Sequence, residues 1–290
     1  TGALLSEGKE IASVTDTQKP VVKVYFHAVK ALAPLKAGVK VSARVSSDRY
    51  RTACNHTATH VINAALKQVF GDTTRQAGSE VDPVRFRFDY TITKAPTREE
   101  MARVEEIANA AVNADYRVSK AERPLADAEK FGATMLLGEH YKDPARFILI
   151  NRGGFDAAKD RYSLELCGGT HIDHTGELIV IKILKDSSVS RGVRRIEGVA
   201  GPAAVQHLSG LAKVAETLSA RLSVPAKDLP LRVEQMLENI KELKAGKAKA
   251  VQAPAPAAGR HLLKEGIDGS GSSFMVYDAG SMEMKGLRGL

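Results

Sequence analysis

Two short motifs, far apart in the chain, constrain this sequence most, because each places two metal-binding side chains four residues apart. His56 and His60 stand at the start of an apolar pattern that is typical of a helix. Side chains at this spacing lie on one helical face, so both imidazoles can reach the same ion. Cys167 and His171 flank Gly168-Gly169, and these glycines favour a tight loop that turns His171 back toward Cys167.

Three imidazoles and one thiolate form a set of ligands that suits zinc. We therefore predict a zinc site made of His56, His60, Cys167 and His171. Each motif alone is a weak signal, because helix histidines are often only solvated or packed and a single cysteine is often simply buried. Both motifs together make a much stronger case.

The residues around these motifs argue against two classes of zinc enzyme. A zinc-protease helix needs a glutamate directly after its first histidine, and Thr57 stands there instead. A zinc nucleobase deaminase needs a P-C-x-x-C segment, which this sequence lacks.

Length and charge limit the remaining classes. The chain has 290 residues and a net charge of +8. This length predicts two or three compact units, and the basic charge is consistent with a polyanionic partner such as nucleic acid. Tryptophan is absent, which makes binding by extensive base stacking less favoured. No apolar run reaches membrane-spanning length and no signal peptide is visible, so we predict no membrane association.

Cysteine usage indicates the compartment. Cys54 and Cys167 are the two cysteines of the chain. If Cys167 binds a metal, Cys54 has no disulfide partner, which fits a reducing environment and predicts a cytoplasmic protein. Since the sequence begins at Thr1 and not at a methionine, we expect it to be a piece of a longer protein.

The order of patterns along the chain predicts an α+β fold in four parts. Residues 1–50 are rich in strand patterns and predict a small β-barrel or sandwich. Residues 51–202 mix helices and strands, contain both metal-binding motifs and predict an α+β domain. Residues 203–250 carry leucines at helical spacing and predict a helical hairpin or coiled-coil arm. Residues 251–290 predict a linker and the truncated start of a further domain.

Local signals place elements inside the α+β domain. The first motif lies in a helix expected from about Thr57 to near Gly71. Thr97 has capping-box spacing and opens a second helix that we expect to reach about Asp115. The second motif follows a predicted strand from Tyr162 to Leu166, and another strand is expected from Leu178 to Leu184.

A strand with alternating side chains lies between the two motifs. Its aromatic face is expected in the core, and its arginine face is either solvated or a contact for phosphate. The aromatic residues are Phe86, Phe88 and Tyr90, and the arginines are Arg85 and Arg87.

Several motifs together resemble the editing domain of alanyl-tRNA synthetase, in the same order and at similar spacing. Related modules occur in threonyl-tRNA synthetase and in free-standing alanyl-editing proteins. The resemblance is close over residues 1 to about 205 and looser beyond. It is carried by Asn55–His60, Gln76-x-Gly78-Ser79, Arg87-Phe88-Asp89, Glu165–His171 with Thr175-Gly176, and Gly192–Glu197.

This resemblance implies hydrolysis of the ester that joins a wrong amino acid, serine or glycine, to the 3′ end of the alanine tRNA. Such a site is needed because an alanine pocket cannot strongly exclude glycine or serine, so discrimination by binding saturates near roughly 10²-fold. The resemblance assigns the four zinc ligands named above and places Thr59 and Gln76 near the amino acid of the substrate. It also implies that the arginine-bearing strands and the basic surface hold tRNA phosphates, and that a homodimer could form through the arm or the C-terminal domain. No aminoacylating region is visible in these residues.

Some assignments stay open at this level. Glu165 is a candidate for supporting the site or acting as a base, and equally for a salt-bridged strand residue. Four protein ligands fill a tetrahedral shell, whereas a catalytic zinc usually keeps one position open. Either one ligand is loose, or the metal mainly positions substrate while a separate water attacks. A free-standing deacylase and a tRNA-binding module with a purely structural zinc are the alternatives. Where the family often has serine, this chain has Thr57, and Cys54 is either a bystander or a competing thiol.

Overall fold

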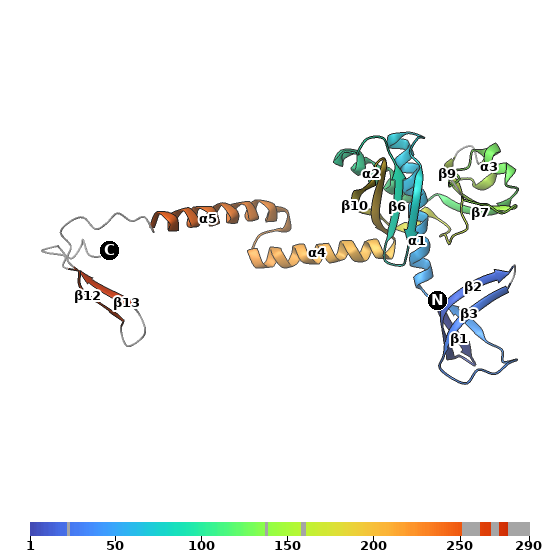
Figure 1. The fold of residues 1–290 in the computed structure, drawn as a ribbon, viewed down its shortest axis with the longest axis horizontal. Coiled ribbons are helices and arrows are strands. Elements are labelled where there is room, and N and C mark those ends of the chain that lie inside the picture. Colours follow the sequence, from blue (N-terminus) through green and yellow to red (C-terminus); the bar gives the residue numbers. More distant parts are fainter. Residues whose placement is uncertain (22–23, 137–138, 158–160, 251–261, 268–272, 278–290) are drawn as a thin grey trace. The chain divides into compact units, whose positions relative to one another are not determined.

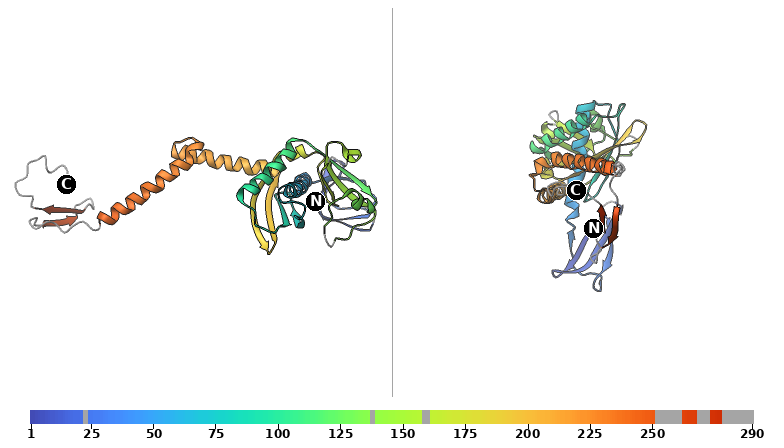
Figure 2. Two further views of the ribbon diagram at one scale, coloured as in Figure 1. Left: turned by 90° about the horizontal axis from the view of Figure 1, so that it is seen from above. Right: turned by 90° about the vertical axis from the view of Figure 1, so that its left-hand side faces the viewer.

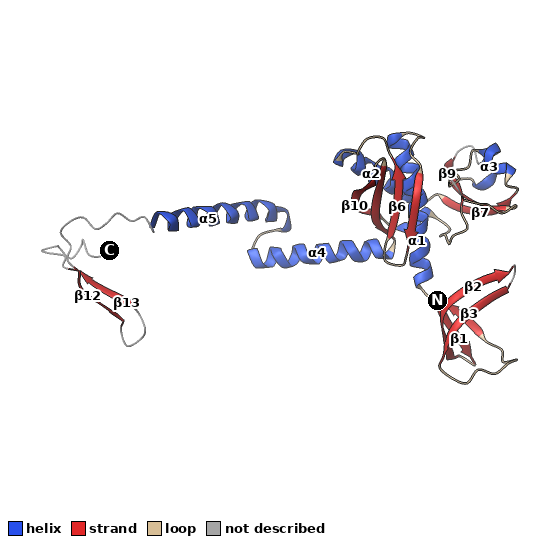
Figure 3. Cartoon of the chain, viewed as in Figure 1, coloured by secondary structure: helices blue, strands red, loops and turns tan. Residues whose placement is uncertain are grey.

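The computed structural model describes residues 1–21, 24–136, 139–157, 161–250, 262–267 and 273–277. It has two compact units, Thr1–Lys213 and Val214–Leu290. The fold is α+β, with antiparallel sheets and a helical C-terminal part, which confirms the predicted class (Figures 1 and 3). Among the helices in the described ranges, none is long and apolar enough to cross a membrane.

The first four strands form a sheet of their own, in the order β3-β2-β1-β4 (Figure 1). Within the described residues β3 and β4 are the edges of an open sheet, so the small barrel predicted for residues 1–50 is not confirmed. Closing a barrel requires its edge strands to pair, and the segment that joins these two, residues 32–41, contains no strand. The strands are β1 (Gly2–Ser6), β2 (Lys9–Val21), β3 (Val24–Ala31) and β4 (Ser42–Val45).

The α+β domain is organised around helix α1 (Asp48–Phe70), which lies between two antiparallel sheets (Figures 1 and 2). One sheet has the order β10-β11-β6-β5 and the other β7-β8-β9. Because α1 packs against both sheets, most residues of this helix are buried. The core therefore continues from one sheet through the helix to the other. The strands are β5 (Gln76–Val81), β6 (Phe86–Thr91), β7 (Arg117–Arg123), β8 (Ala145–Asn151), β9 (Arg161–Leu166), β10 (Ile181–Ser190) and β11 (Val193–Ala200).

Short helices complete this domain. Helix α2 (Arg98–Asn113) packs beside α1, and α3 (Ala126–Phe131) follows β7. Two single-turn 3₁₀ helices, η1 (Gly154–Ala157) and η2 (Thr175–Leu178), lie before β9 and before β10.

The aromatic strand behaves as its alternation predicts. Phe86, Phe88 and Tyr90 on β6 are fully buried against the core. Arg85 and Arg87 lie on the other face, where Arg85 is exposed and Arg87 is half-buried. The prediction of an aromatic core face and an arginine outer face is therefore confirmed.

Helix boundaries follow local signals where these exist. Helix α2 begins after Thr97, whose hydroxyl accepts from Glu100 N (3.2 Å) while the Glu100 carboxylate accepts from Thr97 N (2.7 Å), so the predicted capping box is present. Helix α1 ends at Phe70 as expected, with Gly71 at a φ of 85°.

Two predicted boundaries are wrong. Helix α1 begins at Asp48, nine residues before the expected start at Thr57. Its first turn is exposed, with the Ser46 hydroxyl accepting from Asp48 N (3.2 Å), and burial against the domain begins at Ala53 and Cys54. The strand expected from Leu178 begins only at Ile181, because Leu178 ends η2 and the chain turns at Ile179 with a φ of 59°.

The C-terminal region contains the two helices that its leucine spacing predicts. Helix α4 (Pro202–Leu222) crosses the boundary between the two units, and α5 (Leu229–Ala250) follows the 3₁₀ turn η3 (Ala226–Asp228). A hairpin of β12 (Leu262–Ile267) and β13 (Ser273–Tyr277) lies in the second unit. The linker expected at residues 251–258 is outside the described residues. Domain boundaries at residues 50, 202 and 250, and a hairpin or coiled-coil arm, stay predictions.

Candidate metal centre

Helix α1 presents the two histidines of the first motif on the same face. His56 and His60 are one turn apart, and their ring centroids are 5.5 Å from each other. His60 is buried and His56 is half-buried. The helical spacing that the sequence shows therefore produces the side-by-side imidazoles it predicts.

The second motif is a loop that leaves strand β9 and returns toward α1. Cys167 follows the last residue of β9, and its backbone N–H still donates to the carbonyl of Arg146 on β8 (3.1 Å). The guanidinium of Arg146 donates to the carbonyls of Cys167 (3.2 Å) and Gly169. Strand β8 thus fixes both ends of the turn that carries the thiol.

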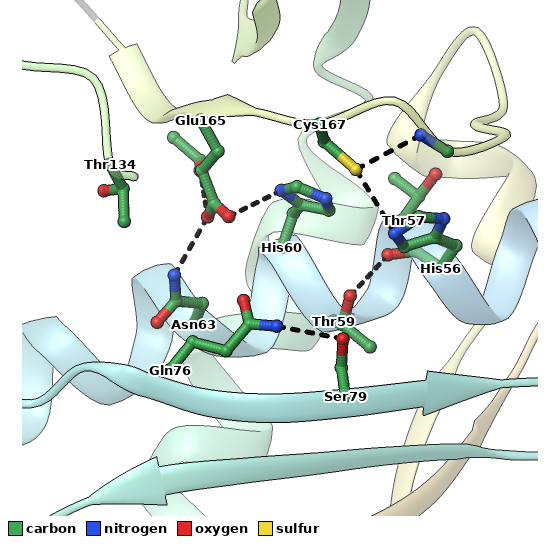
Figure 4. A network of polar contacts seen from close by, with 12 residues as sticks. His56, Thr57, Thr59, His60, Asn63, Gln76, Ser79, Thr134, Glu165 and Cys167 are labelled. Carbon is green, nitrogen blue, oxygen red and sulfur yellow. Dashed lines mark hydrogen bonds and ion pairs between the residues drawn. The ribbon is translucent and has the colours of Figure 1, made fainter. Parts of the chain in front are cut away.

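The four side chains converge on one point, and Figure 4 shows three of them, His56, His60 and Cys167. Their candidate ligand atoms all lie within 4.8 Å of one another. The sulfur of Cys167 is 3.4 Å from Nε2 of His56 and 3.4 Å from Nε2 of His171. Ligands bound to a tetrahedral zinc at about 2.0–2.3 Å would be separated by about 3.5 Å. The arrangement therefore fits one ion with three nitrogen ligands and one sulfur ligand.

Gly169 allows this approach. A Cβ at this position would fall 1.9 Å from Cε1 and 2.3 Å from Nδ1 of His56. The neighbouring Gly168 has open space around the same position. The loop can reach the helix histidines because a residue without a side chain lies against the His56 ring.

Thr57 orients the histidine of the loop. Its hydroxyl lies 3.2 Å from Nδ1 of His171 and accepts from the backbone N–H of Ile172 (3.3 Å). Since Nε2 of His171 faces the sulfur, Nδ1–H is the donor to Thr57. The residue that excludes the zinc-protease class thus holds a ligand in place, a role that its identity alone did not reveal.

Glu165 orients the buried histidine of the helix. Its Oε2 lies 2.8 Å from Nδ1 of His60, although the ring N–H is not aligned with the carboxylate and finds no other partner among the described residues. Its Oε1 accepts from Nδ2 of Asn63 (3.0 Å) and from the hydroxyl of Ser163 (2.9 Å). With Nδ1 directed at this carboxylate, Nε2 of His60 is left to face the cluster.

Electrostatics favours charged Glu165 and His60. Burial alone would raise the pKa of Glu165, but the charge on His60 and the hydrogen bonds from His60, Asn63 and Ser163 hold that pKa below its usual value. Burial also opposes the charged form of His60, yet the Glu165 carboxylate outweighs it and raises the pKa of His60 to about 10. The carboxylate is therefore an anion fixed beside the imidazole at neutral pH.

Cys167 and His171 are held in the protonation states that a metal requires. Burial would raise the pKa of Cys167, but hydrogen bonds from His171, His56 and His60 lower it to about 3. Burial lowers the pKa of His171 to about 4, against the opposing effect of its hydrogen bond to Cys167. A thiolate and a neutral imidazole are ligands for zinc without further loss of protons. The donors and the glycine contact together fit the predicted ion, which would take the place of the proton on Nε2 of His60 while Nδ1–H stays directed at Glu165.

The two residues expected near the substrate lie beside this cluster. Thr59 is buried on α1, and its hydroxyl donates to the carbonyl of His56 (2.7 Å). Gln76 is half-buried on β5, where its amide donates to the hydroxyl of Ser79 (2.9 Å). In Figure 4, Gln76 and Ser79 reach from β5 toward the stretch of α1 that carries Thr59 and Asn63. Their contact with a substrate stays a prediction.

Cys54 is not part of the cluster. It is two residues before His56 and therefore faces another side of α1, where it is fully buried against the backbone of Gly201. Burial raises its pKa to about 11, so it is a neutral thiol. The structure favours the bystander over the competing thiol.

The arginines of the sheet that contains β6 and β11 are less available for binding phosphate than the sequence suggests. Those on β11 and beside or on β6 each have a carboxylate partner within the chain. The pairs are Arg85–Glu197 (2.8 Å), Arg87–Glu80 (2.8 Å), Arg195–Asp89 (2.7 Å) and Arg194–Asp186. A phosphate would have to compete with these carboxylates for the same guanidinium groups.

Sequence reasoning missed three residues that support the ligands, namely Asn63, Ser163 and Arg146. The first two had a signal: Asn63 is three residues after His60 on the same helical face, and Ser163 shares the strand face of Glu165 and Cys167. Arg146 had none, because its role depends on the pairing of β8 with β9.

Comparison with known proteins shows which family this chain resembles. The family described as the threonyl and alanyl tRNA synthetase second additional domain matches residues 149–197, which include Cys167 and His171. The alanine–tRNA ligase of Elusimicrobium minutum is 44% identical over 234 residues, covering 80% of this chain and 27% of the relative. The alanine–tRNA ligase of Caulobacter vibrioides is 35% identical over 290 residues, covering 99% of this chain and 33% of the relative. The chain thus spans about a third of the length of these relatives.

The fold and the matched segment place the chain among proteins that carry this second additional domain. Identity over most of the chain narrows the assignment, because the similar relatives are alanine–tRNA ligases. The chain belongs to the alanine–tRNA ligase family.

Proposed function

We propose that this chain hydrolyses mischarged alanine tRNA, releasing serine or glycine from the 3′ end, as the editing part of an alanine–tRNA ligase. One observation carries the proposal: two distant motifs bring three imidazoles and a thiolate within 4.8 Å of one another in a chain related to alanine–tRNA ligases. In this reaction water adds to the ester carbonyl, the bond to the ribose oxygen breaks, and the free amino acid leaves.

His56, His60, Cys167 and His171 would hold zinc. When bound, zinc supplies Lewis-acid stabilisation at the ester carbonyl and orients the substrate. Thr59 and Gln76, beside the cluster, would contact the amino acid, and the size of the space they leave would decide which amino acids enter.

Glu165 acts on the site through His60 rather than as a base that touches substrate. Both of its oxygens are engaged, one near His60 and the other by Asn63 and Ser163. Glu165 as a whole residue is only 5% exposed, so a water has little access to its carboxylate. A positioning role accounts for all three partners, whereas a general base needs an oxygen within reach of the attacking water.

Three further elements belong to this proposal: the partner, the oligomeric state and the location. The partner is the alanine tRNA, for which the basic charge of the chain provides attraction. A homodimer through α4, α5 or the region beyond them is compatible with the exposed leucines on these helices. A cytoplasmic location agrees with two free cysteines.

The direct test is release of amino acid from seryl-, glycyl- and alanyl-tRNA carrying the alanine tRNA sequence, with and without a chelator. We expect serine and glycine to be released, alanine to be spared, and the chelator to stop the release. Equal release of alanine would contradict editing, and full activity of a zinc-free chain would contradict a metal-dependent site.

A purely structural zinc in a tRNA-binding module remains the second candidate, because four protein ligands would close the coordination shell. Gln76→Ala and Thr59→Ala separate the two. If the site is catalytic, these variants keep their zinc and their thermal stability but lose hydrolysis. If zinc is only structural, they change no activity, while Cys167→Ala unfolds the chain.

A further inference from the structure

Asn55 joins the helix that carries two metal ligands to two separate segments of one sheet. It is fully buried on α1, directly before His56. Its Nδ2 donates to the carbonyl of Asp82 (2.8 Å), in the turn between β5 and β6. Its Oδ1 accepts from the backbone N–H of Ala200 (3.0 Å), the last residue of β11. These two hydrogen bonds, the Asn55 bridge, hold the helix at one end of the sheet β10-β11-β6-β5.

The turn between β5 and β6 is itself closed by hydrogen bonds. The Asp82 carboxylate accepts from the backbone N–H groups of Val84 (2.6 Å) and Arg85 (2.8 Å). The N–H of Asp82 donates to the carbonyl of Arg85 (3.1 Å). Among the described strands, β5 is an edge of its sheet and pairs only with β6. The Asn55 bridge therefore connects the helix to the fixed end of an edge strand.

The bridge lies close to the residues that we expect beside the amino acid. Thr59 is one turn after Asn55, on the same helical face. On β5, Ser79 is three residues before Asp82, or about 10 Å along the strand, and its hydroxyl accepts from Nε2 of Gln76 (2.9 Å). In Figure 4, Ser79 and Gln76 reach from β5 toward α1. The bridge thus controls how close the strand lies to the helix at this place.

We propose that Asn55 is a positioning residue, which fixes the separation between Thr59 on α1 and the Ser79–Gln76 pair on β5 and thereby sets which amino acid is released. The inference rests on the proposed function, because it takes the amino acid of the ester to lie between these residues. Serine differs from alanine by one hydroxyl. A site recognises that hydroxyl only when its own hydrogen-bonding groups stand at a fixed distance.

The metal ligands have their supports elsewhere. Glu165 and Ser163 lie on β9, and Arg146 lies on β8. Both strands belong to the sheet β7-β8-β9, whereas the two bonds of Asn55 go to the sheet that contains β5. Loss of the bridge should therefore move β5 relative to α1 and leave the ligands in place. Retained zinc together with lost discrimination distinguishes this role from general damage to the site.

Asn109 provides a matched control for the loss of stability. Asn55→Ala leaves the buried carbonyl of Asp82 and the N–H of Ala200 without this partner, which destabilises the fold. On α2, Nδ2 of Asn109 donates to the carbonyl of Ile181 (2.9 Å) and its Oδ1 accepts from the N–H of Ile181 (2.9 Å). Asn109 thus joins a helix to the same sheet by the same two kinds of bond, but at β10, the edge opposite β5.

The test compares Asn55→Ala, Asp82→Ala, Asp82→Asn and Asn109→Ala with the parent chain. Asp82→Ala loosens the turn without changing the helix, and Asp82→Asn keeps an oxygen that accepts from the same two N–H groups. The kinetic arm measures kcat/KM for seryl- and alanyl-tRNA below the unfolding temperature of every variant. A second arm follows amide hydrogen exchange in β5 and at Ala200. Zinc content is measured throughout.

For Asn55→Ala we expect the ratio of kcat/KM for seryl-tRNA to that for alanyl-tRNA to fall about tenfold, the lower end of what one small group contributes to discrimination. Asp82→Ala should give a smaller fall in the same direction. Asp82→Asn and Asn109→Ala should keep the ratio of the parent chain. Exchange in β5 should become faster in Asn55→Ala and Asp82→Ala, and the zinc content should not change in any variant.

An unchanged ratio in Asn55→Ala would overturn the inference, and if that variant does not fold, an unchanged ratio in Asp82→Ala would do so. An equal fall in Asn109→Ala would also overturn it, because any loosening of the sheet would then have the same effect. Loss of zinc from Asn55→Ala would place the effect on the ligands and contradict the inference as well. The exchange arm needs no hydrolysis, so faster exchange in β5 of Asn55→Ala, with no serine released by the parent chain, would contradict the proposed function and leave the bridge intact.

Discussion

The two pairs of metal ligands in this chain are built in different ways. His56 and His60 stand on a regular helix, and local geometry alone sets them side by side. Cys167 and His171 stand on a loop whose shape depends on contacts with other elements, such as the Arg146 guanidinium and the Thr57 hydroxyl. One pair is preorganised by the sequence next to it, and the other by the tertiary fold.

This difference indicates how substitutions near each pair should affect the metal ligands. A change near the helix pair should weaken one ligand and leave the other in place, because the helix persists. A change in the loop should move both of its ligands together, because they share one turn. Four main variants, two of them with a companion variant for comparison, test this contrast, and we place the four in order of decreasing expected effect.

Gly169→Ala should have the largest effect. The new Cβ would fall 1.9 Å from the His56 ring, so either the loop or the ring must move. We expect loss of zinc binding together with about 1–3 kcal/mol of stability, the usual cost of overpacking. Zinc titration and thermal unfolding measure both effects.

Gly168→Ala is the matched control, because a Cβ there meets open space. It should bind zinc like the parent chain. If both alanine variants bind zinc equally well, the loop is not positioned by its approach to His56.

Glu165→Gln should come next and act on the helix pair. The substitution removes the charge beside His60 and weakens the hydrogen bond that orients its ring, and losses of this kind typically reduce metal affinity about 10–100-fold. Asn63→Ala should reduce zinc affinity less, since Ser163 still donates to the same oxygen.

The double variant that combines Glu165→Gln with Asn63→Ala tests whether Asn63 acts through Glu165. The combined loss in zinc affinity should be smaller than the sum of the single losses, because the second change removes a contact that no longer matters. Additive losses would show that Asn63 affects the site independently of Glu165.

Thr57→Val should have a smaller effect, on the loop pair. The variant keeps the shape of the side chain but removes the hydrogen bond to Nδ1 of His171. One such bond is worth about 1 kcal/mol, or roughly fivefold in zinc affinity. Zinc competition titration measures it, and an effect larger than that of Glu165→Gln would reverse the proposed order of the two supports.

Arg85→Ala should have the smallest effect. Arg85 is exposed on the sheet and its pair with Glu197 involves neither ligand motif, so we expect a change of about 0.5 kcal/mol or less in stability. Zinc affinity should not change. A clear loss of zinc would indicate that the sheet surface, and not the local supports, sets the geometry of the centre.

The same contrast explains what could be predicted from the sequence. The paired imidazoles of His56 and His60, the capping box at Thr97 and the buried face of β6 follow from spacing within a few residues, and the structure places them as predicted. The four residues predicted as ligands lie together, but the convergence of their two motifs depends on the tertiary fold. The true start of α1 at Asp48 was missed because the helix was taken to begin with its apolar pattern, whereas its exposed first turn follows the Ser46 hydroxyl, which accepts from Asp48 N. Arg146 was missed because its role requires β8 to pair with β9. The expected barrel is not confirmed because closure depends on pairing between edge strands, which no local pattern reports.

The most direct test of the account is the coordination shell of the zinc-loaded chain, measured by X-ray absorption at the zinc edge. We predict one zinc per chain, bound by three nitrogen ligands and one sulfur ligand, and loss of the sulfur signal in Cys167→Ala. A shell without sulfur in the parent chain, or an unchanged shell in that variant, would contradict a centre formed by His56, His60, Cys167 and His171.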